Sequence, residues 1–385
     1  GAAGASIRLA GDGEHGLGNR VGEAQILRWR AIGLVLAAVL AGAMGAISCD
    51  EATFYGPPAP DDASPGPTGE SDASDASGAS DGARGDAGER PTISVMVEPG
   101  DRAGALLSAV QGATKSVHVT MYLLTYAPFI DALVAQKKDA HHEVKVLLNA
   151  NFPDGTNGNQ SAYDQLTAAG VDVAWAPSTF VYTHEKCIII DGATAWIMTM
   201  NLTYSATTSN REFLVIDRDA TDVTEAESIF EADFANQAAT VAGPLVVAPV
   251  NASDSLLALT AAATTTLDVE GETFSDRDMT GSLVAAKNRG VAVRVVLSDA
   301  APTPAQRDAV TTLKNASIPV VSVSSPYIHA KAMVADGAQA YVGSENFTYN
   351  SLHSNRELGV ILTTPSEVTR VSTAIQADFA QGTPL

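Results

Sequence analysis

The chain has 385 residues, and its formal net charge at pH 7 is −21. This length allows two or more domains. A chain this acidic repels the phosphate backbone of nucleic acids except at a local basic patch, which disfavours a general nucleic-acid-binding protein. Residues 91–385 contain 17 Lys and Arg and 31 Asp and Glu, which gives 17 − 31 = −14, so strong attraction to anionic lipid head groups is disfavoured as well.

An export signal is predicted in residues 1–49. Arg28 and Arg30 precede an apolar run, residues 31–47, which ends just before Cys49. A basic segment, a short apolar run and a small residue before a break are typical of export signals rather than of full membrane spans. The segment resembles a bacterial lipoprotein signal, which implies lipidation of Cys49 and anchoring at the bacterial cell envelope. An ordinary signal peptide, with secretion, or an uncleaved anchor is the alternative.

A disordered linker is predicted in residues 50–90. This segment consists largely of Pro, Gly, Ser, Ala and Asp in irregular repetition. Such a composition cannot bury enough apolar surface to fold. We therefore expect an acidic tether between the membrane end and a folded body.

The remaining chain divides near Gly243-Pro244 into two halves of matched order, residues 91–243 and 244–385. Strand-like runs alternate with helical ones in each half, which predicts an α/β fold with a largely parallel or mixed sheet. Two pseudo-equivalent sandwich halves should meet about an internal two-fold axis and share one cleft, so we expect a monomeric catalytic body. The predicted strands are 116–124, 143–148, 265–269 and 291–297, with helices near 129–138 and 281–289.

The second half repeats part of the first at one fixed offset of 145 positions, without an insertion. A match of this length is an internal repeat, and it makes a chance origin of the shared polar residues untenable. The repeated pairs are Tyr182 and Tyr327, His184 and His329, Lys186 and Lys331, Asp191 and Asp336, Asn201 and Asn346, Arg211 and Arg356, and Glu212 and Glu357.

Each repeat begins as a predicted β-hairpin, because Asp191-Gly192 separates two apolar, β-branched runs. Side chains alternate along a strand, so His184 and Lys186 share one face. A loop of residues 191–194 would place His184 opposite Asn201 and Lys186 opposite Thr199. The second copy would likewise place His329 opposite Asn346 and Lys331 opposite Ser344.

An imidazole, an ammonium and a carboxamide on one sheet face suit a phosphate diester, whose anionic oxygens accept hydrogen bonds. The doubled pattern resembles the phospholipase D superfamily, which is marked by His-x-Lys, an Asp five residues after the Lys, and a Gly-Ser-x-Asn stretch. His329-Ala330-Lys331, Asp336 and Gly343-Ser344-Glu345-Asn346 fit this pattern in full. The first copy has Met198-Thr199 in place of Gly-Ser, and threonine keeps the hydroxyl.

The resemblance implies a phosphohistidine intermediate that water or an alcohol then attacks. It implies that His184 is the nucleophile and His329 the general acid, and that Glu212 and Glu357 hydrogen-bond to the histidines. A carboxylate on one ring nitrogen would fix the tautomer and raise the basicity of the other. The remaining predicted site residues are Lys186, Lys331, Asp191 and Asp336 as catalytic, and Asn201, Asn346, Thr199, Ser344, Tyr182 and Tyr327 as substrate-binding.

Asp191 and Asp336 are interpreted as more structural than chemical, since Asp-Gly also serves as turn chemistry. Cys187 is expected to be a small core residue, because alternation places it on the strand face opposite Lys186. No metal or other cofactor is expected, since His141-His142 lacks a ligand-spaced partner.

Three functions remain open at this point. The first is a phospholipase D-type phosphodiesterase that hydrolyses phospholipid or transfers the phosphatidyl group, with an uncharged or zwitterionic lipid preferred. The second is a secreted or periplasmic, metal-independent endonuclease, which the acidic charge disfavours. The third is a catalytically inactive binding lipoprotein, which the complete pairs of His, Lys, Asn and Glu disfavour.

Overall fold

The structure is a computed structural model that describes residues 92–100 and 102–385. The predictions of an export signal, of lipidation at Cys49 and of a linker concern residues outside these ranges. No helix in the described ranges is both long and apolar enough to cross a membrane.

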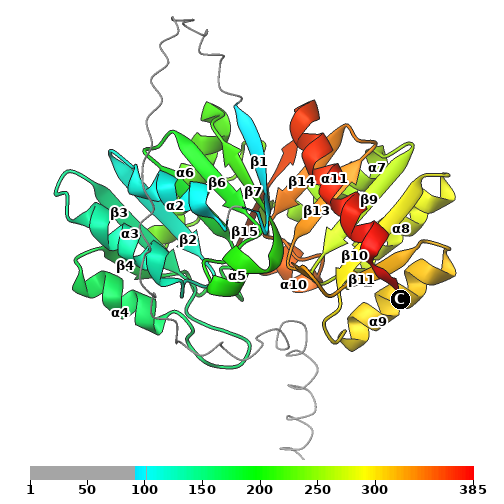
Figure 1. The fold of residues 1–385 in the computed structure, drawn as a ribbon, viewed down its shortest axis with the longest axis horizontal. Helices are drawn as coiled ribbons and strands as arrows, with labels where there is room; N and C mark the ends of the chain where they lie inside the picture. Colours follow the sequence, from blue (N-terminus) through cyan, green and yellow to red (C-terminus); the bar gives the residue numbers. More distant parts are fainter. Residues whose placement is uncertain (1–91, 101) are drawn as a thin grey trace, which may run out of the picture. The chain divides into compact units, whose positions relative to one another are not determined.

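The first half contains seven strands and five helices among the described residues (Figure 1). They are β1 (Ile93–Glu98), α2 (Gly104–Gln111), β2 (Ser116–Met121), α3 (Ala127–Lys137), β3 (Glu143–Leu148), α4 (Gln160–Ala168), β4 (Asp172–Trp175), β5 (Lys186–Ile190), β6 (Thr194–Met198), α5 (Tyr204–Thr208), β7 (Asn210–Asp217) and α6 (Ala220–Phe234).

The second half repeats this order with local additions. Its elements are β8 (Val246–Ala248), α7 (Ala252–Ala262), β9 (Thr266–Gly271), α8 (Arg277–Asn288), β10 (Ala292–Ser298), α9 (Pro304–Asn315), β11 (Val320–Val323), β12 (Tyr327–Ile328), β13 (Lys331–Ala335), β14 (Gln339–Gly343), α10 (Tyr349–His353), β15 (Glu357–Leu362), α11 (Pro365–Gln381) and β16 (Thr383–Pro384).

Both sheets are mixed, as predicted. The strand order is β1-β7-β6-β5-β2-β3-β4 in the first sheet and β16-β11-β10-β9-β13-β14-β15-β8 in the second. The strands β2, β3 and β4 are parallel because helices α3 and α4 connect them, whereas the hairpin β5-β6 and its neighbour β7 are antiparallel. The predicted α/β class with two pseudo-equivalent halves is therefore confirmed.

The apolar residues form a central core and two outer cores. In the first half, one sheet face packs against α2, α3 and α4, and in the second half the corresponding face packs against α7, α8 and α9. The central core joins the other two sheet faces to α6 and α11, and it includes residues from both halves. Cys187 lies in this central core with 2% of its surface exposed, where the structure gives it a packing role.

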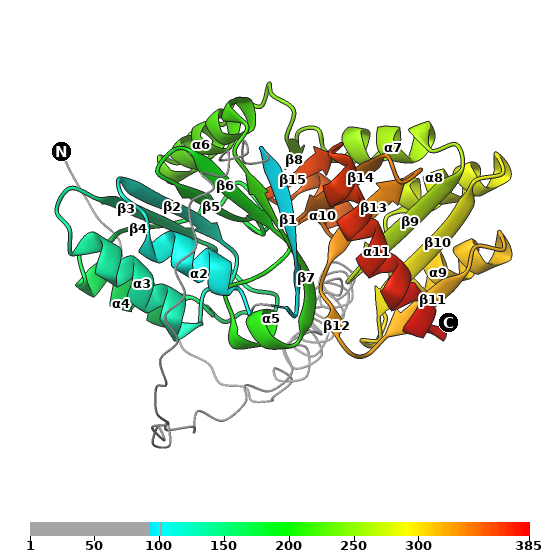
Figure 2. The same ribbon diagram turned by 45° about the horizontal axis from the view of Figure 1, so that its top comes forward.

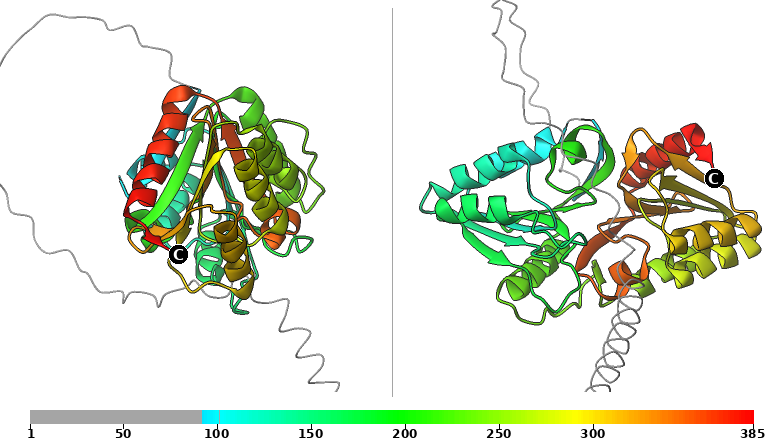
Figure 3. Two further views of the ribbon diagram at one scale, coloured as in Figure 1. Left: turned by 90° about the vertical axis from the view of Figure 1, so that its right-hand side faces the viewer. Right: turned by 90° about the horizontal axis from the view of Figure 1, so that it is seen from below.

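Backbone pairing joins the two halves. The strand β12 of the second half pairs in parallel with Asn210 and Arg211 of β7, and Thr183 forms the matching bridge with Arg356 (Figure 2). Each histidine-bearing segment therefore crosses to the edge of the other half. Seen from below, the cyan-to-green first half and the yellow-to-red second half lie side by side (Figure 3).

Two buried ion pairs reinforce this junction and follow the same pseudo-symmetry. The Arg211 guanidinium donates to Asp378 of α11 at 2.5 Å, and Arg356 donates to Asp233 of α6 at 2.6 Å. Each pair links one half to the other, and each carboxylate lies 167 or 123 positions from its arginine. Removal of one partner would leave a buried charge without compensation, so these pairs hold the halves in one arrangement.

The hairpin register differs by one residue from the predicted one. Asp191 and Gly192 both adopt positive φ, of 59° and 61°, and Ile190 pairs with Thr194. The turn therefore contains only residues 191–193, and Cys187 lies opposite Ile197. The second copy pairs Ala332 with Val342, which is the same shift. The predicted pairing of Lys186 with Thr199, and of Lys331 with Ser344, is wrong because the loop is three residues long rather than four.

The turn aspartates lie at the end of each hairpin farthest from the histidines. The Asp336 carboxylate accepts hydrogen bonds from the backbone N–H groups of Thr264, Thr265 and Thr266 at 2.7–2.9 Å. Asp191 accepts the corresponding bonds from residues 114–116. These bonds lower the pKa of both carboxyls and tie each hairpin turn to the start of β2 or β9. The catalytic role predicted for Asp191 and Asp336 is therefore corrected to a structural one.

We predict that Asp336→Asn lowers the free energy of unfolding by about 1–3 kcal/mol, because an amide cannot satisfy the three backbone donors as a carboxylate does. Turnover per folded molecule should be unchanged. Urea unfolding together with an assay corrected for the folded fraction measures both quantities. Asp308→Asn, at an exposed position of α9, is the matched control. A loss of turnover larger than the loss of folded protein would return Asp336 to the catalytic site.

Candidate active site

The central feature is an exchange of carboxylates between the two halves. His184 of the first half places Nδ1 2.9 Å from the carboxylate of Glu357, which belongs to the second half. His329 of the second half places Nδ1 2.8 Å from Glu212 of the first half. Glu357 has the expected hydrogen bond with a histidine, whereas Glu212 lies at ion-pair distance from His329 without a hydrogen bond to its Nδ1, and in both pairs the partner belongs to the opposite repeat. The crossing of residues 182–184 and 327–329 to the other half's sheet edge explains this exchange.

The site is nearly closed to solvent. His184 is 4% exposed and His329 is 8% exposed, while Glu212 and Glu357 are fully buried. Lys186 and Lys331 are also fully buried, and each ammonium donates to the backbone carbonyl of its own histidine two residues earlier. In such surroundings electrostatic interactions are stronger than in water, so both lysines are suited to hold an anionic group between the histidines.

The histidine of the first half is held neutral. Burial lowers the pKa of His184 to about 4, assisted by the charges of Lys186 and Lys331 and opposed by Glu357. Burial alone would raise the pKa of Glu357, but His184 and Lys186 lower it, so this carboxyl is ionised. A neutral His184 whose Nδ1 donates to Glu357 keeps its lone pair on Nε2, which is the state a nucleophile requires.

The paired asparagines have unused hydrogen-bonding capacity. The side-chain oxygens of Asn201 and Asn346 are buried and have no hydrogen-bond partner among the described residues. Both side chains follow the second strand of their hairpin, beyond β6 and β14. Buried amides usually have partners, so these two groups are suited to a bound ligand.

Both paired hydroxyl groups hydrogen-bond to the strands that carry the glutamates, and Thr199 also bonds to Glu212 itself. Thr199 donates to Glu212 at 2.5 Å and accepts from the Phe213 N–H, and the Ser344 hydroxyl accepts from the Leu358 N–H. Both side chains are fully buried. The substrate-binding role predicted for Thr199 and Ser344 is therefore corrected: they hold the strands that carry the two glutamates.

Met198 of the first repeat stands where the second repeat has Gly343, and the apolar core accommodates this difference in size. A Cβ at Gly343 would come within 2.4 Å of the Tyr341 hydroxyl and the Glu345 carboxylate, so those two side chains occupy the space beside this glycine. In the first repeat Met198 itself is fully buried in the outer core. The difference between Met198 and Gly343 therefore concerns core volume, while the lysines and histidines keep their places.

The two predicted tyrosines lie beside the site in different environments. Tyr182 packs edge-on against Tyr122 at a centroid distance of 6.2 Å, whereas Tyr327 donates its hydroxyl to Glu272 at 3.1 Å. Both are partly buried. The Tyr122 ring also contacts the His184 ring at 4.5 Å and lies 4.9 Å from the Lys186 ammonium.

Tyr122 and Glu272 were missed by the sequence reasoning. Leu124 forms a bridge with Leu202, and Phe274 forms the equivalent bridge with Phe347. Leu124 and Phe274 therefore occupy equivalent places at the ends of β2 and β9, and they lie 150 positions apart, not 145. An extra five residues in the first half separate β2 from its motif. A comparison at one fixed offset cannot align Tyr122 with Glu272, and a separate alignment of the strands β2 and β9 would have been the usable signal.

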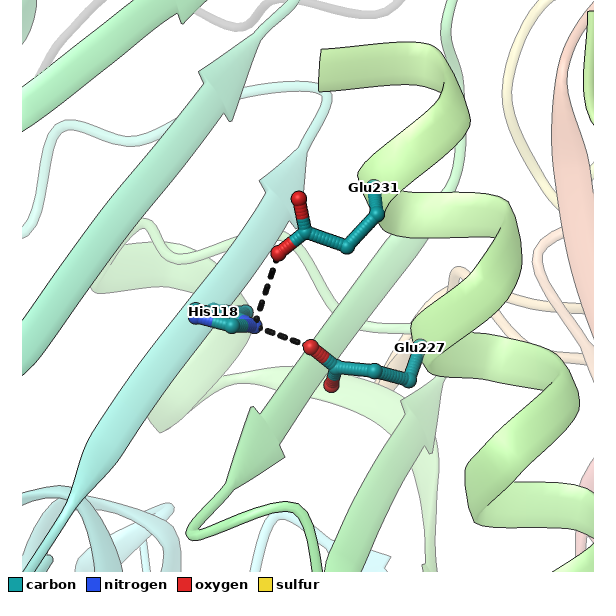
Figure 4. Close-up of side chains that lie close together, drawn as sticks. All are labelled: His118, Glu227 and Glu231. Carbon is teal, nitrogen blue, oxygen red and sulfur yellow. Dashed lines mark hydrogen bonds and ion pairs between the residues drawn. The ribbon is translucent and has the colours of Figure 1, made fainter. Parts of the chain in front are cut away.

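A second polar cluster lies between β2 and α6 (Figure 4). His118 places Nδ1 2.5 Å from Glu227 and 3.9 Å from Glu231, and its Nε2 lies 3.1 Å from Glu143. These residue types can bind a metal ion. However, Lys145 donates to Glu231 at 2.8 Å and contacts Glu143 at 2.5 Å, and an ammonium there opposes a second cation.

The cluster is better explained as an ion-pair network around a protonated His118. Burial alone would lower the pKa of His118, but the hydrogen bond and charge of Glu227 raise it above 6.5. The equivalent positions of the second half support this explanation, since there Asp268 receives two hydrogen bonds from Arg294 at 2.7 Å. Both halves therefore neutralise charge beneath the helix that covers this sheet face.

The duplicated α/β fold thus carries two histidine–glutamate pairs that are exchanged between its halves. Residues 106–234 and 256–381 each match the family described as "Cardiolipin synthase, PLD-like domain". The chain belongs to the phospholipase D superfamily, as the sequence motifs predicted.

Individual relatives match shorter stretches. Phospholipase D Y of Dictyostelium discoideum is 36% identical over 92 residues, which cover 22% of this chain and 20% of that protein. Phospholipase D Z of the same organism is 34% identical over 107 residues, which cover 26% of this chain and 25% of that protein. The chain thus matches a fifth to a quarter of the length of these relatives.

A solved structure shows the same fold. The phosphatidylserine synthase of Haemophilus influenzae Rd KW20 superposes with a TM-score of 0.61 at 11% identity, over 77% of this chain and 88% of that chain. At this identity the likeness concerns the fold alone.

We predict that kcat/KM loses activity on the acid side only near pH 4, because His184 stays neutral down to its lowered pKa of about 4. An ordinary histidine would place this limb near pH 6.5. Since the unfolded chain binds a proton on this histidine below pH 6.5, stability should also fall as the pH drops from 6.5 towards 4. A rate profile from pH 3.5 to 8, with the folded fraction measured at each point, checks both. An acid limb at pH 6 or above, in fully folded enzyme, would contradict the neutral state.

We predict that Glu227→Gln destabilises the protein on the order of 1 kcal/mol more at pH 5.5 than at pH 9. The raised pKa of His118 means that its ion pair contributes fully below pH 6.5 and is lost as the pH rises through the folded-state value. Urea unfolding at both pH values measures the difference, with Ser228→Ala on the exposed face of α6 as control. A loss independent of pH, or stabilisation of the native protein by Zn²⁺, would favour a different role for the cluster.

Proposed function

We propose that this protein is a phospholipase D-type phosphodiesterase that hydrolyses phospholipid head-group diesters, or transfers the phosphatidyl group to an alcohol, through a phosphohistidine. The observation that carries the proposal is the exchanged pairing of His184 with Glu357 and of His329 with Glu212. Two buried histidines, each supported by a carboxylate, provide a nucleophile and a general acid in one site.

The chemistry follows from these positions. Nε2 of His184 attacks phosphorus while His329 donates its proton to the departing alkoxide, so one N–P bond forms as one P–O bond breaks. His329, now neutral, then takes a proton from water or an alcohol, whose oxygen displaces His184 from phosphorus. Lys186 and Lys331, with the side-chain N–H groups of Asn201 and Asn346, donate to the phosphoryl oxygens in both steps. These donors are in place before the reaction, so they stabilise the charge of the transition state without having to reorganise.

Two exposed tyrosines favour a lipid substrate over a nucleic acid. Tyr204 and Tyr349 are 63% and 64% exposed, and they begin the short helices α5 and α10 that follow Asn201 and Asn346. Tyrosine is favoured where an apolar phase meets water, because its ring is apolar and its hydroxyl polar. The overall charge of −21 opposes a long nucleic-acid track.

An envelope location accords with this substrate. We propose that residues 1–49 direct export and that Cys49 is a lipid attachment site, so that residues 50–90 tether the enzyme near a membrane. A second contact through the exposed tyrosines would add to this attachment at the lipid surface.

The test is a metal-free assay of the full chain against phosphatidylcholine, phosphatidylglycerol, cardiolipin and single-stranded DNA, each with excess chelator. We expect turnover of phosphatidylcholine to persist in chelator, because the lysines supply the positive charge at the phosphate. His184→Ala and His329→Ala should each lower turnover by at least about 10³-fold, as expected when residues act as a unit.

His353→Ala is the control, since this partly exposed histidine stacks on Tyr349 and belongs to neither pair. Cleavage of DNA without turnover of any lipid would overturn the lipid substrate and favour the endonuclease. Metal-reversible loss of all activity in chelator would overturn the metal-free mechanism.

A further inference from the structure

Glu272 breaks the symmetry of the two halves at the reacting atoms. It follows β9, and by the offset of 150 positions it occupies the place that Tyr122 occupies after β2. A carboxylate in one half therefore corresponds to an aromatic ring in the other. Glu272 is 7% exposed, so this charge lies inside the site rather than on the surface.

The carboxylate contacts the catalytic groups of its own half. Its Oε2 lies 2.8 Å from the Lys331 ammonium and 3.5 Å from Nε2 of His329, and its Oε1 accepts from the Tyr327 hydroxyl at 3.1 Å. Burial alone would raise the pKa of Glu272, but the charges of His329 and Lys331 lower it to about 2, so it is ionised throughout the working range.

His329 thus lies between two carboxylates, with Glu212 at Nδ1 and Glu272 at Nε2. Glu272 is therefore an anionic acceptor on the side of the reacting nitrogen, 3.5 Å from Nε2. A protonated Nε2 has no lone pair, so it can give a proton to a leaving group but cannot attack phosphorus.

His184 lacks this second carboxylate. Its Nδ1 faces Glu357, its ring lies at 67° to the Tyr122 ring, and no further carboxylate of the described residues reaches ion-pair distance of its Nε2. The two histidines have equivalent first partners and differ in what faces the reacting nitrogen. This difference is sufficient to separate an acid from a nucleophile, because like groups acquire different roles when their environments differ.

We propose, on the basis of the function proposed above, that Glu272 is a positioning residue that reserves His329 for proton donation and thereby leaves the attack on phosphorus to His184. In the first step the proton of His329 Nε2 passes to the leaving oxygen. In the second step Nε2 recovers a proton from water, and Glu272 again holds it there. The carboxylate itself forms no bond to phosphorus and undergoes no net change.

The groups that face His329 are Glu212 from β7, Glu272 after β9, Tyr327 of β12 and Lys331 of β13, with His184 across the site. Among them, Glu272 is the carboxylate on the side of Nε2. Removing only the charge of Glu272 should therefore weaken proton donation from this nitrogen to a leaving group that needs a proton.

The first experiment compares Glu272→Gln with the native enzyme on phosphatidylcholine and on a p-nitrophenyl phosphodiester. For the phospholipid, kcat/KM should fall by about tenfold or more, because its leaving oxygen needs the proton of His329. The p-nitrophenolate group leaves without a proton, so its release should change less than about threefold. Glu272→Asp, which keeps the charge, should restore activity on the phospholipid towards the native value.

Glu270→Gln is the control, because this buried carboxyl lies within β9, two residues earlier, near Arg211 and Asp378 rather than at His329. It should leave the activity on both substrates unchanged. An equal loss on both substrates at every pH in Glu272→Gln would reduce Glu272 to a structural role and overturn the proposal, while the phosphodiesterase function would stand.

The second experiment introduces a carboxylate at the equivalent position of the first half. Its result does not depend on whether Glu272→Gln folds. Tyr122→Glu places a carboxylate beside His184 and should abolish the acid-labile phosphoryl adduct that forms on His184 with the p-nitrophenyl substrate. The matched neutral variant Tyr122→Gln should still form it. Equal adduct on His184 in both folded variants, or an adduct on His329 in the native enzyme, would overturn the proposal. Absence of any phosphoryl adduct in active native enzyme would instead refute the proposed function.

Discussion

The structure depends on the exchange of carboxylates between the two halves. Each histidine is supported by a glutamate from the opposite repeat, so neither repeat contains a complete catalytic pair by itself. The contacts between the halves extend beyond the site, because the same strands also place Arg211 against Asp378 and Arg356 against Asp233. A shift of one half against the other would separate both histidine–glutamate pairs and both arginine–aspartate ion pairs, and breaking a buried ion pair costs several kcal/mol.

Burial of so many ionisable groups is tolerated because most carry a partner and the rest are neutral. Burial raises the pKa of Glu185 to about 8 and that of Glu345 well above its ordinary value, so both are protonated at pH 7. Glu345 receives the Tyr341 hydroxyl as a partner. The site can therefore keep its positive charge on Lys186 and Lys331 within a strongly acidic chain.

Much of this site could be predicted from the sequence, since the fixed offset of 145 identified the histidines, lysines, asparagines and glutamates together. The exchange could not be predicted, because a repeat in sequence does not state which copy supplies each partner. The roles of Asp191 and Thr199 were misassigned for a related reason. A motif records which residues recur, whereas only the three-residue turn and the bonds to the backbone show that these two hold strands. The fold class followed directly from the alternation of strands and helices.

Duplication produces two equal histidines, but the chemistry needs two unequal ones. The pairs with Glu212 and Glu357 preserve the equality, since each carboxylate approaches Nδ1 at nearly the same distance. The inequality must therefore come from residues outside the repeated motif, and it does so at the ends of β2 and β9, where Tyr122 and Glu272 face the two rings. These positions precede the segment in which the first half is five residues longer, so they do not align at the offset of 145 positions. The geometry shared by the two halves assembles the site. The different residues at the ends of β2 and β9 distinguish its two histidines.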